Sequence, residues 1–105
     1  MSWLIVILVF LLASVKSTKN SNKSVSIVIP AYNEEATVAQ VVSVARKLSY
    51  VDEVIVVDDG SSDRTVEEAE SAGATVISHL VNEGKGSAIK TGFKYSHGNI
   101  VAFID

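Results

Sequence analysis

The sequence predicts an α/β domain with a mostly parallel sheet, in the element order βαβαβαβ. Short apolar runs rich in Val and Ile alternate with segments whose apolar residues recur at helical spacing. Such alternation is typical of parallel strands joined by right-handed helical crossovers. Two of the runs end in polar clusters, as expected at the carboxyl ends of parallel strands, where open sheets bind ligands.

The first strand is predicted over Val25–Ile29, an apolar run interrupted only by Ser26, of the kind that is buried on both faces of a sheet. Pro30 ends this strand. A helix is predicted over Glu34–Leu48, with Asn33 as its N-cap, because its apolar residues form a stripe with helical spacing. The second strand is predicted over Glu53–Val57.

The second helix is predicted over Arg64–Ala72, capped by Asp63 or Ser62 and closed by Gly73 at the C′ position. A short third strand is predicted over Thr75–Ser78.

The third helix is predicted over Lys85–His97, with Ile89 and Phe93 in the core. Gly92 lies on the same face, where it allows the helix to pack closely on the sheet. The fourth strand is predicted over Asn99–Ile104.

Length and composition allow one small domain. The chain has 105 residues and no cysteine, which excludes disulfides and thiolate metal sites. Residues 1–24 carry a charge of +3, whereas residues 25–105 carry all 12 acidic residues and the other 6 basic ones, giving −6. An acidic domain with no basic stripe argues against nucleic-acid binding. It suits a ligand that brings Mg²⁺ or Mn²⁺, because hard cations prefer oxygen ligands.

Residues 1–15 are predicted to form a hydrophobic anchor helix, joined to the domain by a polar linker at residues 16–24. As a helix, the apolar run Trp3–Ala13, extended to Val15, would be roughly 20 Å long, shorter than the ~30 Å hydrocarbon core. A short or tilted anchor is the preferred interpretation. A secretory signal and a soluble core helix are the alternatives. Three lysines follow the run, which predicts a membrane-associated protein with its domain on the cytoplasmic side.

Two acidic residues follow the second predicted strand. Asp58 and Asp59 can accept hydrogen bonds from a nucleobase or a ribose, or help to hold a metal ion, and Gly60 and Ser61 continue the turn. A helix cap is sufficient to explain Asp63, but it does not account for the two acids before it. The pair therefore marks a candidate ligand site.

Residues 82–87 (NEGKGS) open the third predicted helix. Glycines let the backbone approach a phosphate, a helix N-terminus offers unpaired N–H groups, and Lys85 adds positive charge. A simple turn would have the same pattern, so this motif alone is weak. His79 and His97 stand alone in the sequence, and we assign them surface or packing roles.

Four motifs in order resemble the N-terminal half of a family 2 glycosyltransferase with the GT-A fold: IVIPAYNEE, VIVVDDGSSDRT, NEGKGSAIKTGF and GNIVAFID. The resemblance covers all of residues 25–105 and is closest to enzymes that move a sugar from a nucleotide sugar to dolichyl or polyprenyl phosphate. It implies a Rossmann-like half-domain that binds a nucleotide sugar and stops within the D-x-D motif. We therefore expect a fragment that is inactive without the rest of the enzyme, with the edge of its fourth strand exposed.

The resemblance also implies which residues form the nucleotide-sugar site: Pro30, Ala31, Tyr32, Glu34, Asp58, Asp59, Ser61, Gly84 and Lys85. Tyr32 would pack near the base, and Asp59 would bind the base or the ribose. Asp58 and Ser61 would shape the loop that carries Asp59.

Gly84 and Lys85 would lie beside the nucleotide or its diphosphate. By the same resemblance, Asp105 would be the first acid of the D-x-D motif and would hold Mg²⁺ or Mn²⁺ on the diphosphate. The cation would act as a Lewis acid that neutralises the charge growing on the leaving group. The implied partners are a UDP- or GDP-linked sugar, a polyprenyl or dolichyl phosphate acceptor, and a membrane. No catalytic base is evident, and an anionic phosphate acceptor needs little help from one.

Other functions remain as alternatives. One is a non-catalytic nucleotide-binding module, and another is a transferase that acts on a glycan or polysaccharide hydroxyl. A phospho-acceptor signalling domain also has paired acids after a strand, but after its first strand, whereas Asp58 and Asp59 follow the second. A dinucleotide-binding oxidoreductase needs a G-x-G-x-x-G turn after a strand, which this sequence lacks.

Overall fold

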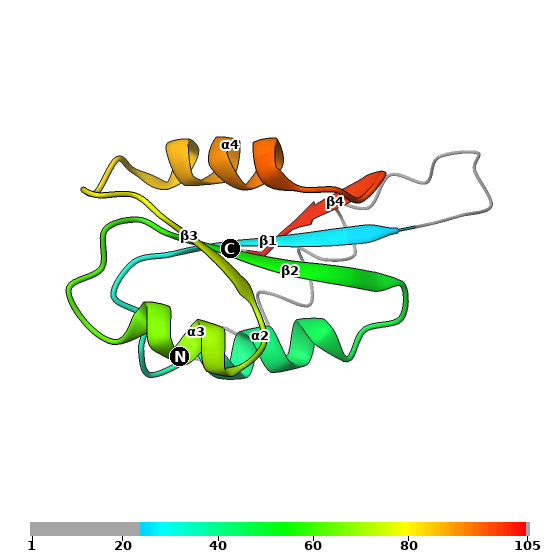
Figure 1. Ribbon diagram of the computed structural model, residues 1–105, viewed down its shortest axis with the longest axis horizontal. Coiled ribbons are helices and arrows are strands. Elements are labelled where there is room, and N and C mark those ends of the chain that lie inside the picture. Colours follow the sequence, from blue (N-terminus) through cyan, green and yellow to red (C-terminus); the bar gives the residue numbers. More distant parts are fainter. Residues whose placement is uncertain (1–23, 105) are drawn as a thin grey trace.

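Parallel strands form a sheet in the order β3-β2-β1-β4 in the computed structural model of this chain, which describes residues 24–104 (Figure 1). In chain order the elements are β1 (Val25–Ala31), α2 (Val38–Arg46), β2 (Val51–Asp58), α3 (Thr65–Ser71), β3 (Thr75–Ser78), α4 (Lys85–Tyr95) and β4 (Ile100–Phe103). The predicted α/β class and element order are confirmed. The predicted anchor at residues 1–15 and the linker up to residue 23 lie outside the described residues. Among the helices described, none is long and apolar enough to cross a membrane.

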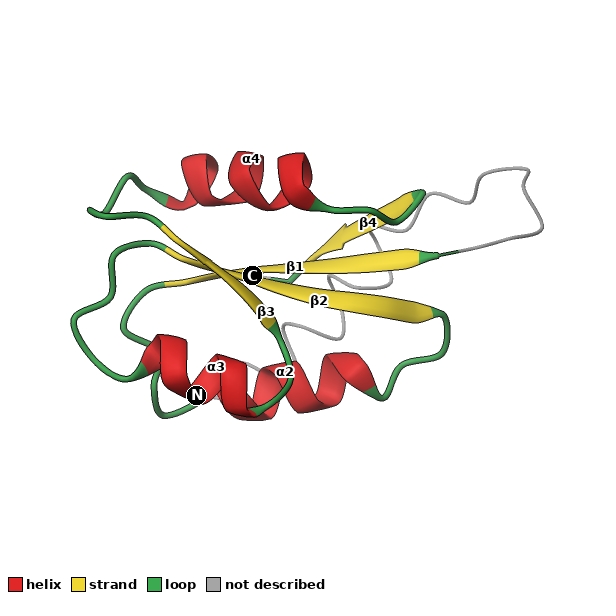
Figure 2. Ribbon diagram, in the orientation of Figure 1, coloured by secondary structure: helices red, strands yellow, loops and turns green. Residues whose placement is uncertain are grey.

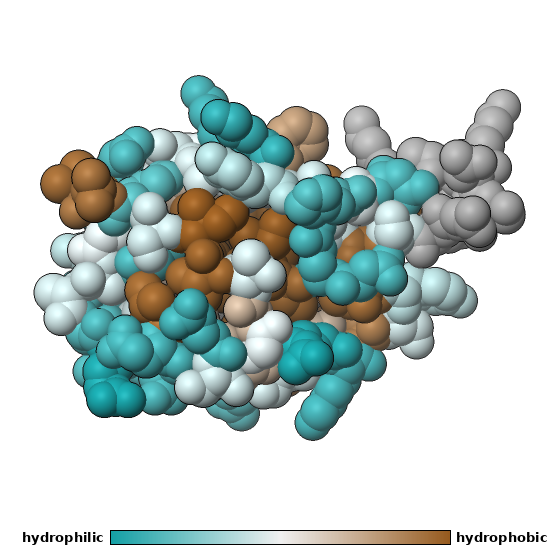
Figure 3. All heavy atoms as spheres, viewed as in Figure 1, coloured by the Kyte–Doolittle hydropathy of each residue, from teal (hydrophilic) through white to brown (hydrophobic). Residues whose placement is uncertain are grey.

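Helices cover both faces of the sheet: α2 and α3 lie on one side and α4 lies on the other (Figure 2). Successive β1 side chains point to opposite faces, so Ile27 packs with α2 and α3 while Val28 packs with α4. Between α4 and the α2–α3 layer, apolar side chains are visible at the surface (Figure 3). Edge strand β3 contributes two half-buried side chains, Val76 and Ile77.

The strand register brings the loops that carry polar residues to one edge of the sheet. β1 and β2 are paired as far as Ala31 and Asp58, and β2 and β3 are paired as far as Asp58 and Ser78. Beyond this pairing, the N–H of Asp59 donates to the carbonyl of Ala31 at 2.8 Å. The loops after β1, β2 and β3 therefore start side by side.

Pro30 lies inside β1 rather than ending it, which corrects the sequence prediction. Backbone groups of alternate strand residues face opposite neighbours. The Val28 carbonyl accepts a bond from Ile104 on the β4 side at 3.0 Å, and the Ala31 carbonyl accepts one from Asp59 on the β2 side at 2.8 Å. The nitrogen of Pro30 therefore faces the β4 side, past the end of the β1–β4 pairing. The lack of an N–H group at Pro30 therefore removes no hydrogen bond between β1 and β2.

The first helix starts later than predicted. It begins at Val38 rather than at Glu34, and Asn33 is not its N-cap but a turn residue with φ of 50°. The Glu34 carbonyl accepts bonds from the N–H groups of Thr37 at 3.1 Å and Val38 at 2.9 Å. The first part of the predicted helix therefore forms a turn before α2.

α4 packs closely on the sheet through Gly92, as predicted, because a Cβ at this position would overlap the side chain of Val28. Phe93, which the sequence places in the core, is instead 62% exposed. The buried face of α4 is the one that carries Ala88 and Gly92. The prediction for Phe93 was wrong because the contact with the sheet is centred on Ala88 and Gly92, and Phe93 lies one position, about 100° around the helix, beyond it.

Candidate functional site

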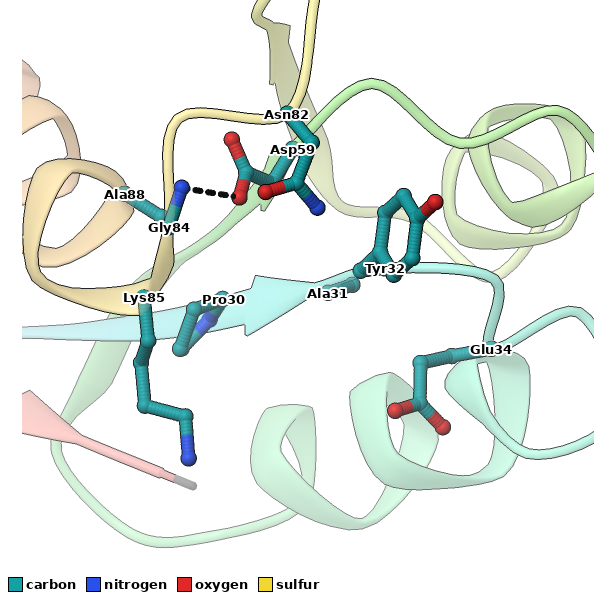
Figure 4. Close-up of a pocket in the computed structure, with 9 residues that line it drawn as sticks. All are labelled: Pro30, Ala31, Tyr32, Glu34, Asp59, Asn82, Gly84, Lys85 and Ala88. Carbon is teal, nitrogen blue, oxygen red and sulfur yellow. Dashed lines mark hydrogen bonds between the residues drawn. The ribbon is translucent and has the colours of Figure 1, made fainter.

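A pocket lies at the carboxyl edge of the sheet, between the loop after β1 and the start of α4 (Figure 4). It is lined by Pro30, Ala31, Tyr32, Glu34, Asp59, Asn82, Gly84, Lys85 and Ala88. The sequence analysis predicts all of these except Asn82 and Ala88. Two other predicted site residues, Asp58 and Ser61, are not part of this lining, and Asp105 lies outside the described residues.

Asp59 is buried beside the pocket and holds the loop that precedes α4. Its Oδ1 accepts a bond from the N–H of Glu83, and its Oδ2 accepts one from the N–H of Gly84, both at 2.8 Å. Burial would raise the pKa of Asp59, but these backbone donors and the neighbouring His79 ring lower the pKa below its usual value. Asp59 is therefore ionised at neutral pH and acts only as an acceptor.

His79 is a residue that the sequence analysis misjudges, because it does not stand alone. Its side chain is only 10% exposed. The Nδ1 atom lies 2.9 Å from Oδ1 of Asp59, and the Nε2 atom lies 2.8 Å from the hydroxyl of Thr91 on α4. The β2–β3 register pairs Asp58 with Ser78, so the residues that follow each strand meet. The contact between His79 and Asp59 could therefore be predicted only from the order of the strands in the sheet.

The turn after β2 forms the support behind the pocket. Asp58 is buried, and its Oδ1 accepts a bond from the N–H of Ser61 at 3.3 Å, consistent with the loop-shaping role expected for both residues. Gly60 has φ of 80°, and a Cβ there would lie 2.7 Å from the backbone nitrogen of Asn82. The loop between β3 and α4 therefore packs directly on this turn, and only glycine fits.

Hydrogen bonds join the loops after β1 and β2. The N–H of Asn33 donates to the Ser61 hydroxyl at 2.8 Å, and the N–H of Ser62 donates to Oδ1 of Asn33 at 2.9 Å. The N–H of Glu34 donates to the hydroxyl of Thr65 at 2.8 Å. One wall of the pocket is thus held in place by the loop behind it.

The opposite wall is the N-terminal end of α4. Gly84 directly precedes the helix and Lys85 is its first residue. In Figure 4 Lys85 lies on one side of Pro30, and the ring of Tyr32 lies on the other side. A helix N-terminus next to a lysine favours an anion such as a diphosphate. The Tyr32 ring is 48% exposed, which leaves it available for contact with a flat ligand group.

The residues from 24 to 104 contain no group of three or more His, Asp or Glu side chains that could hold a metal ion. Asp105, the predicted ligand, follows Ile104, whose N–H donates to the carbonyl of Val28 at 3.0 Å. β4 therefore leads toward the edge of the sheet where the pocket lies. Mg²⁺ is commonly held by one or two carboxylates together with substrate phosphates and water. A single carboxylate from this chain fits a cation that arrives with a phosphate-bearing ligand.

Comparison with known proteins agrees with this geometry. The family model for glycosyl transferase family 2 matches residues 26–105. Glucosyl-3-phosphoglycerate synthase of Mycolicibacterium smegmatis is 39% identical over 94 residues, covering 81% of this chain and 31% of that protein. Undecaprenyl-phosphate 4-deoxy-4-formamido-L-arabinose transferase of Pectobacterium atrosepticum is 37% identical over 93 residues, covering 79% of this chain and 28% of that protein.

Solved structures show the same relationship. A crystal structure of glucosyl-3-phosphoglycerate synthase from Mycobacterium tuberculosis, in complex with Mn²⁺, UDP-glucose and phosphoglyceric acid, is 40% identical with a TM-score of 0.71. The match covers 79% of this chain and 33% of that one. A structure of the same enzyme with Mg²⁺ and UDP has the same TM-score, 0.71. The chain spans about a third of the length of these relatives. Its sequence and its GT-A-type sheet together show that this chain belongs to glycosyl transferase family 2.

Proposed function

We propose that this chain is the donor-binding part of a glycosyltransferase and that it binds a nucleotide sugar in the pocket between β1 and α4. The observation that carries this proposal is the set of groups around that pocket. Asp59 offers an acceptor for an N–H of the base, and Tyr32 offers an aromatic surface. Lys85 and the helix N-terminus offer positive charge for the diphosphate. The UDP-glucose complex of the mycobacterial relative supports a uridine nucleotide as the donor.

In the proposed reaction the bond between the anomeric carbon and the diphosphate oxygen breaks while a bond to the acceptor oxygen forms on the opposite face. The nucleotide diphosphate leaves with the bonding electrons. Lys85 and the N–H groups at the start of α4 stabilise the negative charge that develops on it. Asp105 would hold the divalent cation, which supplies Lewis-acid stabilisation when bound. The Mn²⁺ and Mg²⁺ complexes of the relative support this assignment.

The acceptor that we propose is a polyprenyl or dolichyl phosphate. Support comes from the similarity to the undecaprenyl-phosphate transferase and from the apolar run near the N-terminus. A phosphate acceptor is already anionic at neutral pH, so it needs little help from a base. A hydroxyl acceptor is the second candidate, because the synthase relative has been solved with phosphoglyceric acid.

We also propose that residues 1–15 associate with a membrane and that the domain lies on its cytoplasmic side. The apolar run and the lysines that follow it support this proposal. Flotation of the chain with liposomes tests it, with a variant that lacks residues 1–15 as the control. A chain that stays in the dense fraction together with the control would contradict membrane association.

Calorimetry with UDP and GDP, with and without Mn²⁺, tests the donor site. We expect binding of one of the two nucleotides, strengthened by Mn²⁺, and we expect Asp105→Asn to remove most of that strengthening. Glu70→Gln, an exposed carboxylate on α3, is the matched control. A chain that binds neither nucleotide would contradict the proposal.

Transfer of labelled sugar to undecaprenyl phosphate or to 3-phosphoglycerate separates the two acceptor candidates. The assay uses the whole enzyme of which this chain is the proposed donor-binding part, because we expect the chain to be inactive by itself. Nucleotide binding by that whole enzyme without transfer to either acceptor would favour the non-catalytic module.

A further inference from the structure

We propose that His79 is a positioning residue of the donor site, which fixes the Asp59 carboxylate and, through it, the loop that lines the pocket. This inference rests on the proposed function and deepens it. Four segments meet at the Asp59 carboxylate: the end of β2, the residue after β3, the loop before α4, and α4 itself through Thr91. His79 is the side chain that joins two of them.

The direction of the hydrogen bonds follows from the charge on Asp59. An ionised carboxylate only accepts, so Nδ1 of His79 must carry a proton and donate to Oδ1 at 2.9 Å. The Nε2 atom lies 2.8 Å from the hydroxyl of Thr91, which can either donate to this nitrogen or accept from it. Each end of the ring is therefore held, and its orientation is determined by partners on two different elements.

The bond from His79 also determines which acceptor sites of the Asp59 carboxylate remain open to a ligand. Oδ1 accepts from His79 and from the N–H of Glu83, while Oδ2 accepts from the N–H of Gly84. A carboxylate has about four acceptor sites, so one site on Oδ2 remains for a ligand. Without the bond from His79, the carboxylate would be held only by the two N–H groups of the loop that it positions, so the orientation of Asp59 and of Gly84 would be less constrained.

A direct catalytic role is a poorer explanation for His79. The residue is not part of the pocket lining, and its side chain is only 10% exposed. Both ring nitrogens are used by Asp59 and Thr91, which leaves neither one directed at a reacting atom. The ring therefore acts on the donor through Asp59.

Three substitutions at His79 separate positioning from bulk packing. His79→Asn keeps an N–H donor near the place of Nδ1, whereas His79→Gln places its amide nearer to Nε2, and His79→Ala removes both. We expect UDP to bind about 10-fold more weakly to the Ala and Gln variants, and within about 3-fold of the unchanged chain to the Asn variant. His97→Ala is the matched control, because His97 also faces a carboxylate, Glu53, but at the opposite edge of the sheet.

Calorimetry gives the affinities, and thermal unfolding shows whether each variant is folded. If the Ala variant fails to fold, the UDP affinities of the Asn and Gln variants are compared instead, and this comparison tests the positioning role of His79. Equal UDP affinity in all variants, or an equal loss in Asn and Gln, would overturn the inference while the proposed function stands.

If the unchanged chain binds no nucleotide, the proposed function fails. The positioning of the loop is then read from the amide NMR shifts of Glu83 and Gly84. We expect large changes in the Ala variant that the Asn variant restores. Unchanged shifts in the Ala variant would overturn the inference.

Discussion

Oδ1 of Asn33 accepts a hydrogen bond from the N–H of Ser62 at 2.9 Å, although the two residues are 29 positions apart. Asn33 has φ of 50°, a left-handed conformation that Asn adopts more readily than most residues with a side chain. Asn33 lies in the loop after β1, next to the pocket residue Tyr32, and Ser62 lies in the loop after β2. One residue thus turns the chain out of β1 through its backbone conformation and joins two loops of the site through its side chain.

Substitution of Asn33 should separate these two roles. Asn33→Gly keeps the left-handed turn and loses the side-chain bond, whereas Asn33→Ala loses both. We expect a loss in the free energy of unfolding of about 1 kcal/mol for Gly and about 2–3 kcal/mol for Ala. Urea denaturation measures both values. Equal stability of the Ala and Gly variants would show that the backbone conformation contributes nothing.

The sequence predicts the strands well because their signal is local. β3 is found at Thr75–Ser78, as predicted, and the predicted Glu53–Val57 lies within β2. The start of α2 is not predictable in this way, because the N–H of Glu34 is held by Thr65, a residue distant in the sequence. Local apolar spacing contains no information about that bond.

The same distinction applies to the site. Asp59 and Lys85 are predicted because each belongs to a motif with its own local chemistry. The link between His79 and Asp59 depends on β2 and β3 being neighbours in the sheet, which the chain order alone does not establish. Ala88 lines the pocket only because its helix packs there, and no property of alanine itself indicates this.

Gly92 should tolerate no side chain. A Cβ at this position would overlap Val28 across the α4–sheet contact, so we expect Gly92→Ala to lower the free energy of unfolding by about 1–3 kcal/mol. Gly86→Ala is the control on the same helix, because a Cβ there meets nothing within 4 Å. That variant should be neutral or more stable by up to about 1 kcal/mol. Partial rescue of Gly92→Ala by Val28→Ala would confirm that these two residues are in contact.

The stability contributed by Asp59 should depend on pH. Its pKa in the folded chain lies below the ordinary value of 3.8, because its hydrogen bonds and the His79 ring outweigh the effect of burial. The ionised group therefore contributes stability above that ordinary value, and this contribution is lost as the pH falls through the folded-state pKa. Asp59→Asn removes the charge at every pH, so it should be clearly less stable than the unchanged chain near neutral pH. The difference should shrink in acid.

Urea denaturation over a pH series measures this difference. Glu53 also has a lowered pKa, because its hydrogen bonds from Ser26 and His97 outweigh the effect of its burial, but it is present in both chains and cancels in the comparison. A difference that stays constant down to acid pH would contradict the assignment of the charge to Asp59.

Lys85 should contribute to diphosphate binding and not to binding of the base. It is the first residue of α4 and lines the pocket, where its charge adds to the helix N-terminus. We expect Lys85→Gln to weaken UDP binding roughly 5- to 30-fold, corresponding to about 1–2 kcal/mol, and to leave uridine binding nearly unchanged. The difference should decrease at high salt, because salt screens the charge. Lys90→Gln, an exposed lysine on the same helix, is the matched control and should have little effect. Equal losses for uridine and UDP in the Lys85 variant would instead mean that the substitution disturbs the pocket as a whole.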